Sequence, residues 1–317
     1  MKTISILIPA YNEEQVLHTL INRLDAVTSG LPNYQFEYLF VNDGSTDNTL
    51  FLLKQLVNHR NDISYVNLSR NFGKEVAMLA GFDHTKGQAV IIIDADLQDP
   101  PELIPEMISY WEQGYDDVFA KRRSRAGESW FKKWSSSRYY KILETLSNIP
   151  VQRDTGDFRL LDRRCIDALQ QLREGQRYTK GMYSWIGFNK KEILFDRDPR
   201  AAGETKWNYG KLFNLAIDGI TSSTIAPLRF SSLLGVIISV VAFFFMIIVV
   251  IRAFLYGDPV PGYPSLMAVI LFLGGIQLLS LGIIGEYLGK VFYETKDRPV
   301  YFVEEYVSTI KKDDSAE

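Results

Sequence analysis

Two long apolar runs near the end of the chain constrain its fold most. Residues Phe230 to Ile251 carry no charge over 22 positions, and Tyr263 to Gly285 form a second uncharged run. At about 1.5 Å per residue, a helix of either length crosses a hydrocarbon layer about 30 Å thick. The segment 252–262 between them contains Gly and Pro residues that predict a short turn. The alternative, a pair of buried core helices, fits less well because core helices are usually shorter. We therefore expect a hairpin of two membrane-spanning helices.

Charges around the hairpin predict its orientation. Basic residues lie on both outer flanks, whereas the connecting turn holds only Arg252 and Asp258. The positive-inside rule then places both termini and the N-terminal domain in the cytoplasm. We expect a multi-pass protein of the cell (inner) membrane. The flanking cations are Lys206, Lys211, Arg229, Lys290, Lys296 and Arg298.

Overall composition excludes several classes of protein. A formal net charge of −3 over 317 residues argues against general nucleic-acid binding. Cys165 is the only cysteine, so the chain has no internal disulfide and no zinc-thiolate site. The three histidines lie outside every motif described below, so we expect surface roles for them. The length suits one large domain with an appendage.

The first hundred residues alternate between apolar strand-like runs and more polar helical patterns. This order predicts right-handed crossovers and a mostly parallel sheet with helices on both faces, which is an α/β fold. Ligands of such sheets gather at the carboxyl ends of the strands. The expected strands are 4–8, 36–41, 63–68 and 89–93, with helices starting near 12, 46 and 74.

Three polar motifs follow the first, second and fourth expected strands. They are Pro9–Glu13, Asn42–Asp47 and Asp94-Ala-Asp96. Each alone could be a loop or a helix cap, but together they predict one ligand-binding edge. Two carboxylates spaced i and i+2 at a strand end suit a hard divalent cation on a diphosphate. No Gly-x-Gly-x-x-Gly loop and no Gly-x-x-x-x-Gly-Lys loop occurs, which disfavours dehydrogenases and P-loop nucleotidases.

From Ile4 to about Trp207 the chain resembles the inverting glycosyltransferases of family 2, which have the GT-A fold. The resemblance is carried by Ile-Pro-Ala-Tyr-Asn-Glu, Val-Asn-Asp-Gly-Ser-x-Asp and Asp-x-Asp. With the hairpin, the chain is most similar to the polyprenyl-phosphate glycosyltransferases, which include dolichol-phosphate mannose synthases and bactoprenol glucosyltransferases. The resemblance implies a nucleotide site formed by Pro9, Tyr11, Glu13, Asp43 and Asp94. It also implies that Asp94, Asp96 and Gln98 hold Mg²⁺ or Mn²⁺ against the donor diphosphate.

A basic block, residues 121–138, begins after the strand-like residues 117–120. Arginine suits phosphate oxygens, and basic residues near a bilayer also attract anionic headgroups. Lys132 and Lys133 could serve only this general attraction. The resemblance implies that Arg122 and Arg138 contact the phosphate of the lipid acceptor.

The segment Asp154–Leu161 resembles the part of the family that lines the sugar pocket. The resemblance implies that Asp157 lies beside the reaction centre, although Asp157 could instead cap a turn or pair with Arg159. Mannose synthases usually have Thr-Ser-Gly-Phe-Arg here, so the presence of Asp157 makes this chain more similar to the bacterial glucosyl branch of the family. Whether Asp157 acts as a base or positions substrate stays open.

The segment before the hairpin is similar to a mobile family loop. The resemblance implies that Arg200 and Lys206, on this loop, close over the donor diphosphate and acceptor phosphate. A plain linker is the alternative. Residues 209–228 mix apolar and polar side chains as an amphipathic interfacial helix does. The tail 298–307 is strand-like, and we expect it to pair with another subunit in a homo-oligomer, a tetramer being one such state.

We therefore expect four regions. They are a cytoplasmic GT-A catalytic domain (1–208), an amphipathic segment (209–228), two transmembrane helices with a short outer loop (229–289) and a cytoplasmic tail (290–317). The expected partners are a nucleotide sugar, a polyprenyl phosphate and the membrane. The resemblance implies transfer of a hexose, glucose from UDP-glucose, to undecaprenyl or dolichyl phosphate. Mannosyl, N-acetylglucosaminyl and aminopentosyl transfer stay open. A processive polysaccharide synthase is disfavoured, because the chain lacks Gln-x-x-Arg-Trp and has only two spans.

Overall fold

The computed structural model describes residues 1–123, 155–175, 177–196, 226–256 and 262–308. The chain divides into two compact units. One contains the sheet and its helices together with the tail from Pro299, and the other contains the two long apolar helices. Most of the expected amphipathic segment 209–228 lies outside the described residues.

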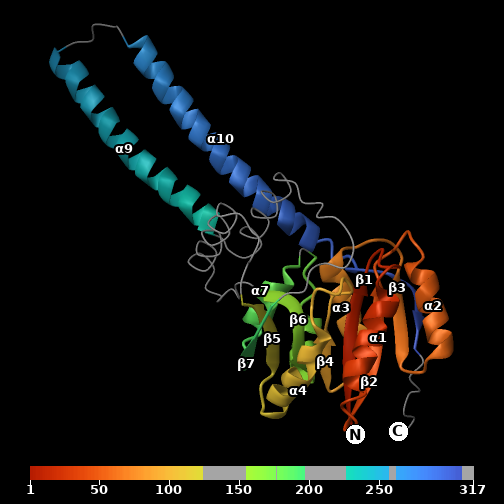
Figure 1. Ribbon diagram of the computed structural model, residues 1–317. Coiled ribbons are helices and arrows are strands. Elements are labelled where there is room, and N and C mark those ends of the chain that lie inside the picture. The colour runs from red at the N-terminus through yellow and green to blue at the C-terminus, as the bar shows by residue number, and fades with distance from the viewer. Residues whose placement is uncertain (124–154, 176, 197–225, 257–261, 309–317) are drawn as a thin grey trace, which may run out of the picture. The chain divides into compact units, whose positions relative to one another are not determined.

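The described part of the first unit is built on an eight-stranded sheet in the order β7-β5-β6-β4-β1-β2-β3-β8 (Figure 1). The four strands β1 to β4 are parallel, as predicted. β6 runs antiparallel to both β4 and β5, so the sheet is mixed. The strands are β1 (Lys2–Ala10), β2 (Tyr34–Asn42), β3 (Ile63–Leu68), β4 (Ala89–Ile92), β5 (Asp117–Arg122), β6 (Thr155–Asp162), β7 (Lys190–Phe195) and β8 (Val303–Val307).

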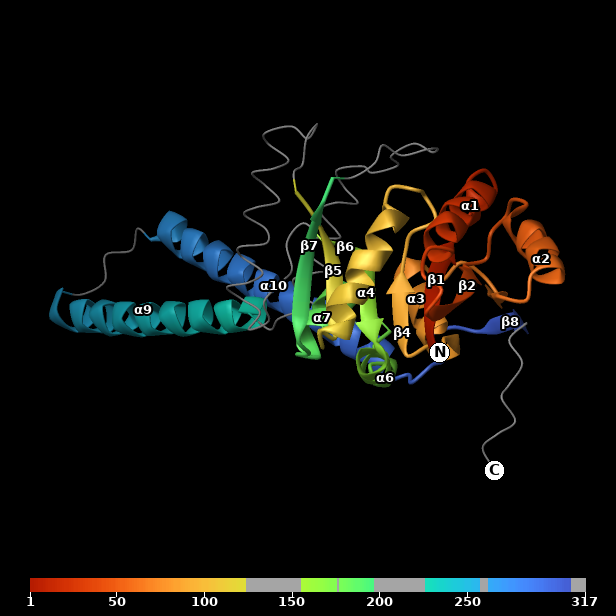
Figure 2. The same cartoon turned by 60° about the horizontal axis from the view of Figure 1, so that its bottom comes forward.

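Helices cover both faces of this sheet (Figure 2). Side chains alternate between the faces along each strand. In β1, Ile6 therefore packs in the core under α1, α2 and α4, while Leu7 packs in the core under α3, α6 and α7. The helices are α1 (Leu17–Thr28), α2 (Thr49–His59), α3 (Lys74–His84), a 3₁₀ turn η1 (Pro101–Leu103), α4 (Ile104–Glu112), α6 (Arg163–Gln171) and α7 (Thr179–Trp185).

The expected strands agree with the structure to within a few residues, and the third helix begins at Lys74 as predicted. The first two helices begin later than predicted, at Leu17 and Thr49. The reason is that the residues after β1 and β2 form loops that hydrogen-bond to each other before either helix starts. Asn12 takes a left-handed conformation, with φ of 57°, and accepts a hydrogen bond from the Thr46 N–H at 2.8 Å.

The tail strand β8 corrects one expectation. We expected the tail to pair with another subunit, but β8 lies antiparallel to β3 of its own chain. Every residue of β3 is buried, so its outer edge needs a cover, and a strand supplies it by pairing. The side chain of Asn67 donates to Glu304 at 2.8 Å, and Lys54 pairs with Glu305 at 2.7 Å. The oligomeric state stays a prediction.

The second unit contains α9 (Ala226–Tyr256) and α10 (Tyr263–Glu294), which run antiparallel (Figure 1). Both are long and apolar enough to cross a membrane by length and composition. The qualifying stretches are Pro227–Phe245 and Phe272–Glu294, and neither has buried residues in its apolar window. α10 continues past the expected boundary at residue 289.

Gly44 allows the loops after β2 and β3 to touch. Its φ is +63°, and a Cβ atom there would meet the Asn71 nitrogen at 2.5 Å and the carbonyl carbon of Arg70. Both neighbours are backbone atoms, so they cannot rotate away. The contact brings the residues after β3 to the same edge of the sheet as those after β2.

We predict that Gly44→Ala lowers the free energy of unfolding by about 2–4 kcal/mol, from left-handed strain plus the backbone clash. Gly114→Ala is the matched control, because Gly114 also has positive φ (+93°) but nothing lies within 4 Å of its added Cβ. It should cost only the strain, about 1–2 kcal/mol. Thermal unfolding of the purified protein measures both, and equal losses would contradict the close-approach argument.

Candidate active site

Strand register brings two predicted site residues together. In the antiparallel pair of β4 and β6, Ile92 lies opposite Arg159. Asp94 lies two residues past the end of β4, and Asp157 lies two residues before Arg159 in β6. The same edge receives the end of β5, because Lys121 lies opposite Thr155. The carboxyl ends of the parallel strands therefore form one edge, and the start of β6, which was not predicted as a strand, lies at the same edge.

Lys74 joins these two carboxylates. Its Nζ lies 2.6 Å from Oδ1 and 2.8 Å from Oδ2 of Asp94, and 2.6 Å from Oδ2 of Asp157. The three side chains come from the first turn of α3, the end of β4 and the start of β6. One ammonium therefore neutralises part of an acidic pair at the expected reaction edge.

The charges in this cluster shift one another's pKa values. Burial tends to raise the pKa of Asp157, but nearby Lys74, Lys180 and Arg159 lower it below its usual value. Desolvation opposes the charge of Lys74, but Asp94 and Asp157 outweigh it and raise the pKa of the lysine. Burial, then the charge of Asp157, raise the pKa of Glu75. Asp157 is thus ionised at neutral pH.

One oxygen of Asp157 remains without a hydrogen-bond partner among the described residues. The residue is only 7% exposed, and its Oδ1 is buried and unpaired. A buried carboxylate oxygen without a partner is costly, so a ligand or water that donates to it gains from the contact. Lys180 lies close by, donating to the Thr155 carbonyl at 3.1 Å.

Asp43 fixes the loop that leads into α3. Its two carboxylate oxygens accept hydrogen bonds from the N–H groups of Phe72 and Gly73, at 2.7 and 2.9 Å. Burial raises the pKa of Asp43 against these two bonds. The resemblance implied a nucleotide contact for Asp43. In the structure Asp43 fixes the start of the helix that carries Lys74, and its nucleotide contact stays a prediction.

The remaining expected nucleotide residues lie on the loop after β1. Tyr11 is 45% exposed, and Pro9 and Glu13 are half-buried. The loop is held by the first residue of α2, since the Glu13 N–H donates to the Thr49 hydroxyl at 2.9 Å. An exposed aromatic ring on a fixed loop can stack on a flat nucleobase.

The expected metal residues fit a divalent cation in donor chemistry. Asp94, Asp96 and Gln98 are all half-buried, and the Gln98 N–H donates to Asp96 at 3.2 Å. Among the described residues, no group of three or more Asp, Glu, His or Cys side chains is arranged to hold a metal. Mg²⁺ is commonly held by one or two carboxylates with substrate phosphates and waters, so two aspartates and an amide oxygen suffice.

Arg159, the alternative ion-pair partner of Asp157, pairs with another acid in the structure. It is fully buried and forms its ion pair with Asp117 at 3.1 Å. Its guanidinium also stacks over the ring of Tyr183, 3.6 Å from the centroid. The Asp157 carboxylate accepts a hydrogen bond from Lys74, a lysine from another element, and Arg159 acts on it through its charge.

The expected acceptor-binding residues are only partly described. Arg122 is half-buried at the end of β5, at the edge that holds Asp94 and Asp157. Arg138, Arg200 and Lys206 lie outside the described residues. Their expected roles stay predictions.

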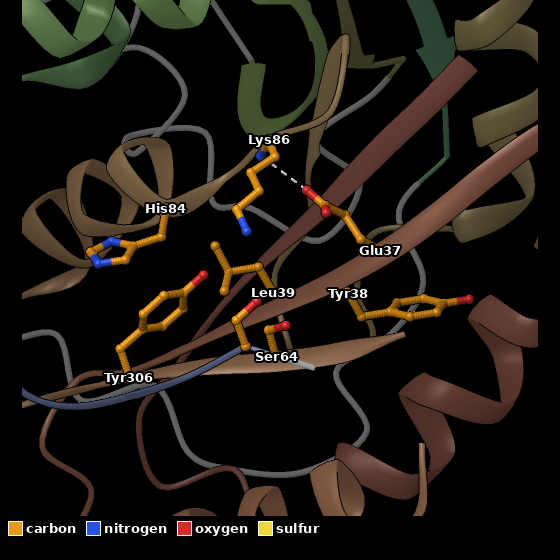
Figure 3. A pocket seen from close by; sticks show the side chains of 8 residues that line it. Glu37, Tyr38, Leu39, Ser64, His84, Lys86 and Tyr306 are labelled. Atoms are coloured by element: carbon orange, nitrogen blue, oxygen red, sulfur yellow. Dashed lines mark hydrogen bonds between the residues drawn. The ribbon is translucent and has the colours of Figure 1, made fainter. Parts of the chain in front are cut away.

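A small hollow lies at the opposite edge of the sheet (Figure 3). Its lining includes Glu37, His84, Lys86 and Tyr306, and a hydrogen bond of 3.0 Å joins the Lys86 N–H to Glu37. Ser64, which also lines it, is the second residue of β3, and Lys86 precedes β4, so this hollow lies near the start of the parallel strands. It is therefore separate from the acidic edge.

Lys74 was missed in the sequence. The three polar motifs follow the first, second and fourth strands, whereas Ser69–Lys74 follows the third. The available signal was a Gly-Lys pair that opens a helix at a strand's carboxyl end.

Comparisons with known proteins identify the family of the chain. The model of the family described as Glycosyl transferase family 2 matches residues 5–169. An uncharacterized glycosyltransferase of Synechocystis is 50% identical over 300 residues, covering 95% of this chain and 94% of the relative. The bactoprenol glucosyl transferase of Shigella phage SfX is 39% identical over 300 residues, covering 95% and 98%.

Similarity to solved structures is weaker. Staphylococcus aureus TarS 1-349 in complex with UDP-GlcNAc has a TM-score of 0.48 and 15% identity, covering 70% of this chain and 66% of that one. The family assignment therefore rests on the sequence matches. With the family motifs, full-length relatives and an α/β sheet that carries the acidic edge, the chain belongs to glycosyl transferase family 2 and is a glycosyltransferase with a GT-A-like fold.

Proposed function

We propose that this enzyme transfers glucose from UDP-glucose to the phosphate of a polyprenyl phosphate, with inversion at the anomeric carbon. The observation that carries the proposal is the acidic cluster of Asp94 and Asp157 at one edge of the sheet, in a chain whose full-length relatives include a bactoprenol glucosyl transferase. The two long apolar helices support an acceptor that stays in a bilayer.

A divalent cation, Mg²⁺ or Mn²⁺, would be held by Asp94, Asp96 and Gln98. When bound, it would neutralise the leaving diphosphate as a Lewis acid. Pro9, Tyr11, Glu13 and Asp43 would bind the nucleotide on the neighbouring loops. Hydrogen bonds join the loop after β1 to Thr46 and Thr49. They support a preformed site, because they fix the loop before any ligand binds.

The acceptor needs little help from a general base. A phosphate monoester is mostly dianionic at neutral pH, because its second pKa is about 6. Asp157 has a lowered pKa and is therefore also an anion at neutral pH. We assign it to stabilise positive charge that develops on the sugar and to orient the acceptor. Arg122, with Arg138, Arg200 and Lys206, would bind phosphate oxygens.

The membrane hairpin would anchor the catalytic domain on the cytoplasmic side of the cell membrane. α9 and α10 would span the bilayer, with the residues between them outside. Such an anchor would suit an acceptor whose isoprenoid chain stays in the bilayer.

The donor prediction is tested with purified protein, polyprenyl phosphate and a panel of labelled nucleotide sugars. We expect label in the organic phase from UDP-glucose, and only with Mg²⁺ or Mn²⁺ present. UDP-N-acetylglucosamine, GDP-mannose and a UDP-aminopentose serve as competitors. Label from one of these instead would refute glucose as the sugar, and a product longer than one sugar would indicate a processive synthase.

We predict that Asp96→Asn lowers transfer by about 100-fold or more, because the charge that holds the cation is lost. Membrane insertion should be unchanged. Asp167→Asn is the matched control, since Asp167 is an exposed acid on α6 whose carboxylate pairs with Arg163. Initial rates at saturating donor measure both variants. Wild-type activity in Asp96→Asn would refute the metal assignment.

The orientation is tested with single cysteines. Cys165 is buried and its pKa is raised by burial, so the native thiol should react little. In right-side-out vesicles, a membrane-impermeant maleimide should label Asp258→Cys but not Glu174→Cys. Inside-out vesicles should give the reverse pattern. Labelling of Glu174→Cys from outside would contradict a cytoplasmic catalytic domain.

A further inference from the structure

The ammonium of Lys74 lies between two carboxylates, where a metal cation could also bind. It lies at 2.6 Å from one oxygen of each of Asp94 and Asp157, which is the arrangement of a counter-ion shared by two acids. Asp94 is also one of the carboxylates assigned to the divalent cation. Lys74 and the divalent cation would therefore both bind the carboxylate of Asp94.

The backbone on both sides of Lys74 is held in place by hydrogen bonds and packing. Gly73, with φ of +95°, and Phe72 are tied to Asp43 through their N–H groups. Farther along α3, Gly81 packs directly on Leu7 of β1. Only the lysine side chain, which is 41% exposed, is left to move.

The two cations cannot share Asp94 without strong repulsion. An ammonium and a divalent ion a few ångströms apart repel in proportion to the product of their charges, and partial burial weakens the screening by water. A diphosphate changes this balance, because it brings negative charge that both cations can contact. The divalent ion then gains phosphate ligands as well as Asp94.

We propose that Lys74 is a displaceable counter-ion that keeps the divalent cation from binding until the nucleotide diphosphate arrives. Without donor, Lys74 holds Asp94 and Asp157. When the donor binds with its cation, Lys74 leaves Asp94 and keeps its contact with Asp157 or turns to a phosphate oxygen. Lys74 thus makes cation binding depend on the donor, and this role rests on the proposed function.

The test measures Mn²⁺ binding, independently of activity, on the full-length protein in detergent. Free Mn²⁺ is followed by electron paramagnetic resonance, with and without UDP. Without UDP, we expect Lys74→Met to bind Mn²⁺ about tenfold or more tightly than wild type, a difference of about 1.4 kcal/mol. With saturating UDP, the difference should shrink to within about threefold.

Three variants control this comparison. Lys74→Arg keeps the charge and should bind Mn²⁺ alone as weakly as wild type. Lys54→Met removes a lysine from an ion pair with Glu305 at 2.7 Å, outside the site, and should match wild type. Adding Asp94→Asn to Lys74→Met should abolish the gain. Lys74→Gln replaces Lys74→Met if the latter does not fold.

The outcomes separate the two proposals. If wild type binds Mn²⁺ with UDP but Lys74→Met gains no affinity without UDP, the counter-ion role is overturned and the metal site stands. If no variant binds Mn²⁺ even with UDP, the metal assignment of the proposed function fails together with this inference. A gain in Lys74→Met that disappears in Lys74→Arg supports the counter-ion role.

Discussion

The ion triplet of Asp94, Lys74 and Asp157 is the interaction on which the candidate site depends. Two carboxylates within reach of one ammonium would otherwise repel each other at a half-buried edge. The triplet exists because β6 lies next to β4 in the sheet and α3 begins at the same edge. Sheet order, helix start and local charge balance therefore depend on one another.

Helix α3 links this triplet to the tail of the chain. Its first residue is Lys74, and near its last turn Asp83 accepts a hydrogen bond from the Tyr301 hydroxyl at 2.6 Å. The ring of His84 packs edge-on against Tyr306 of β8, with centroids 4.7 Å apart. The segment that follows α10 thus packs on the helix that carries the central cation, which ties the tail to the catalytic sheet.

Local patterns in the sequence predicted the strands and helices well, because apolar periodicity and strand ends are local properties. β3 was predicted with the bounds that it has. Long-range pairings were not predictable in the same way. The tail's partner is β3, far along the chain, and nothing near β8 specifies it. The Gly-Lys pair at Lys74 is a local signal, but the contacts of Lys74 with Asp94 and Asp157 depend on long-range pairing, since β4 and β6 must first bring the two acids together.

The proposed reaction adds two phosphate-bearing substrates to an edge that is already acidic. Asp94, Asp96, Asp157 and Glu75 contribute carboxylates, whereas Lys74 and Lys180 are the lysines that interact with Asp157 among the described residues. Binding must then exchange counter-ions as well as fill space. An ammonium that is held by two carboxylates can be released to a phosphate when a divalent cation replaces it on one of them. In this proposal, substrate binding and charge balance are one process.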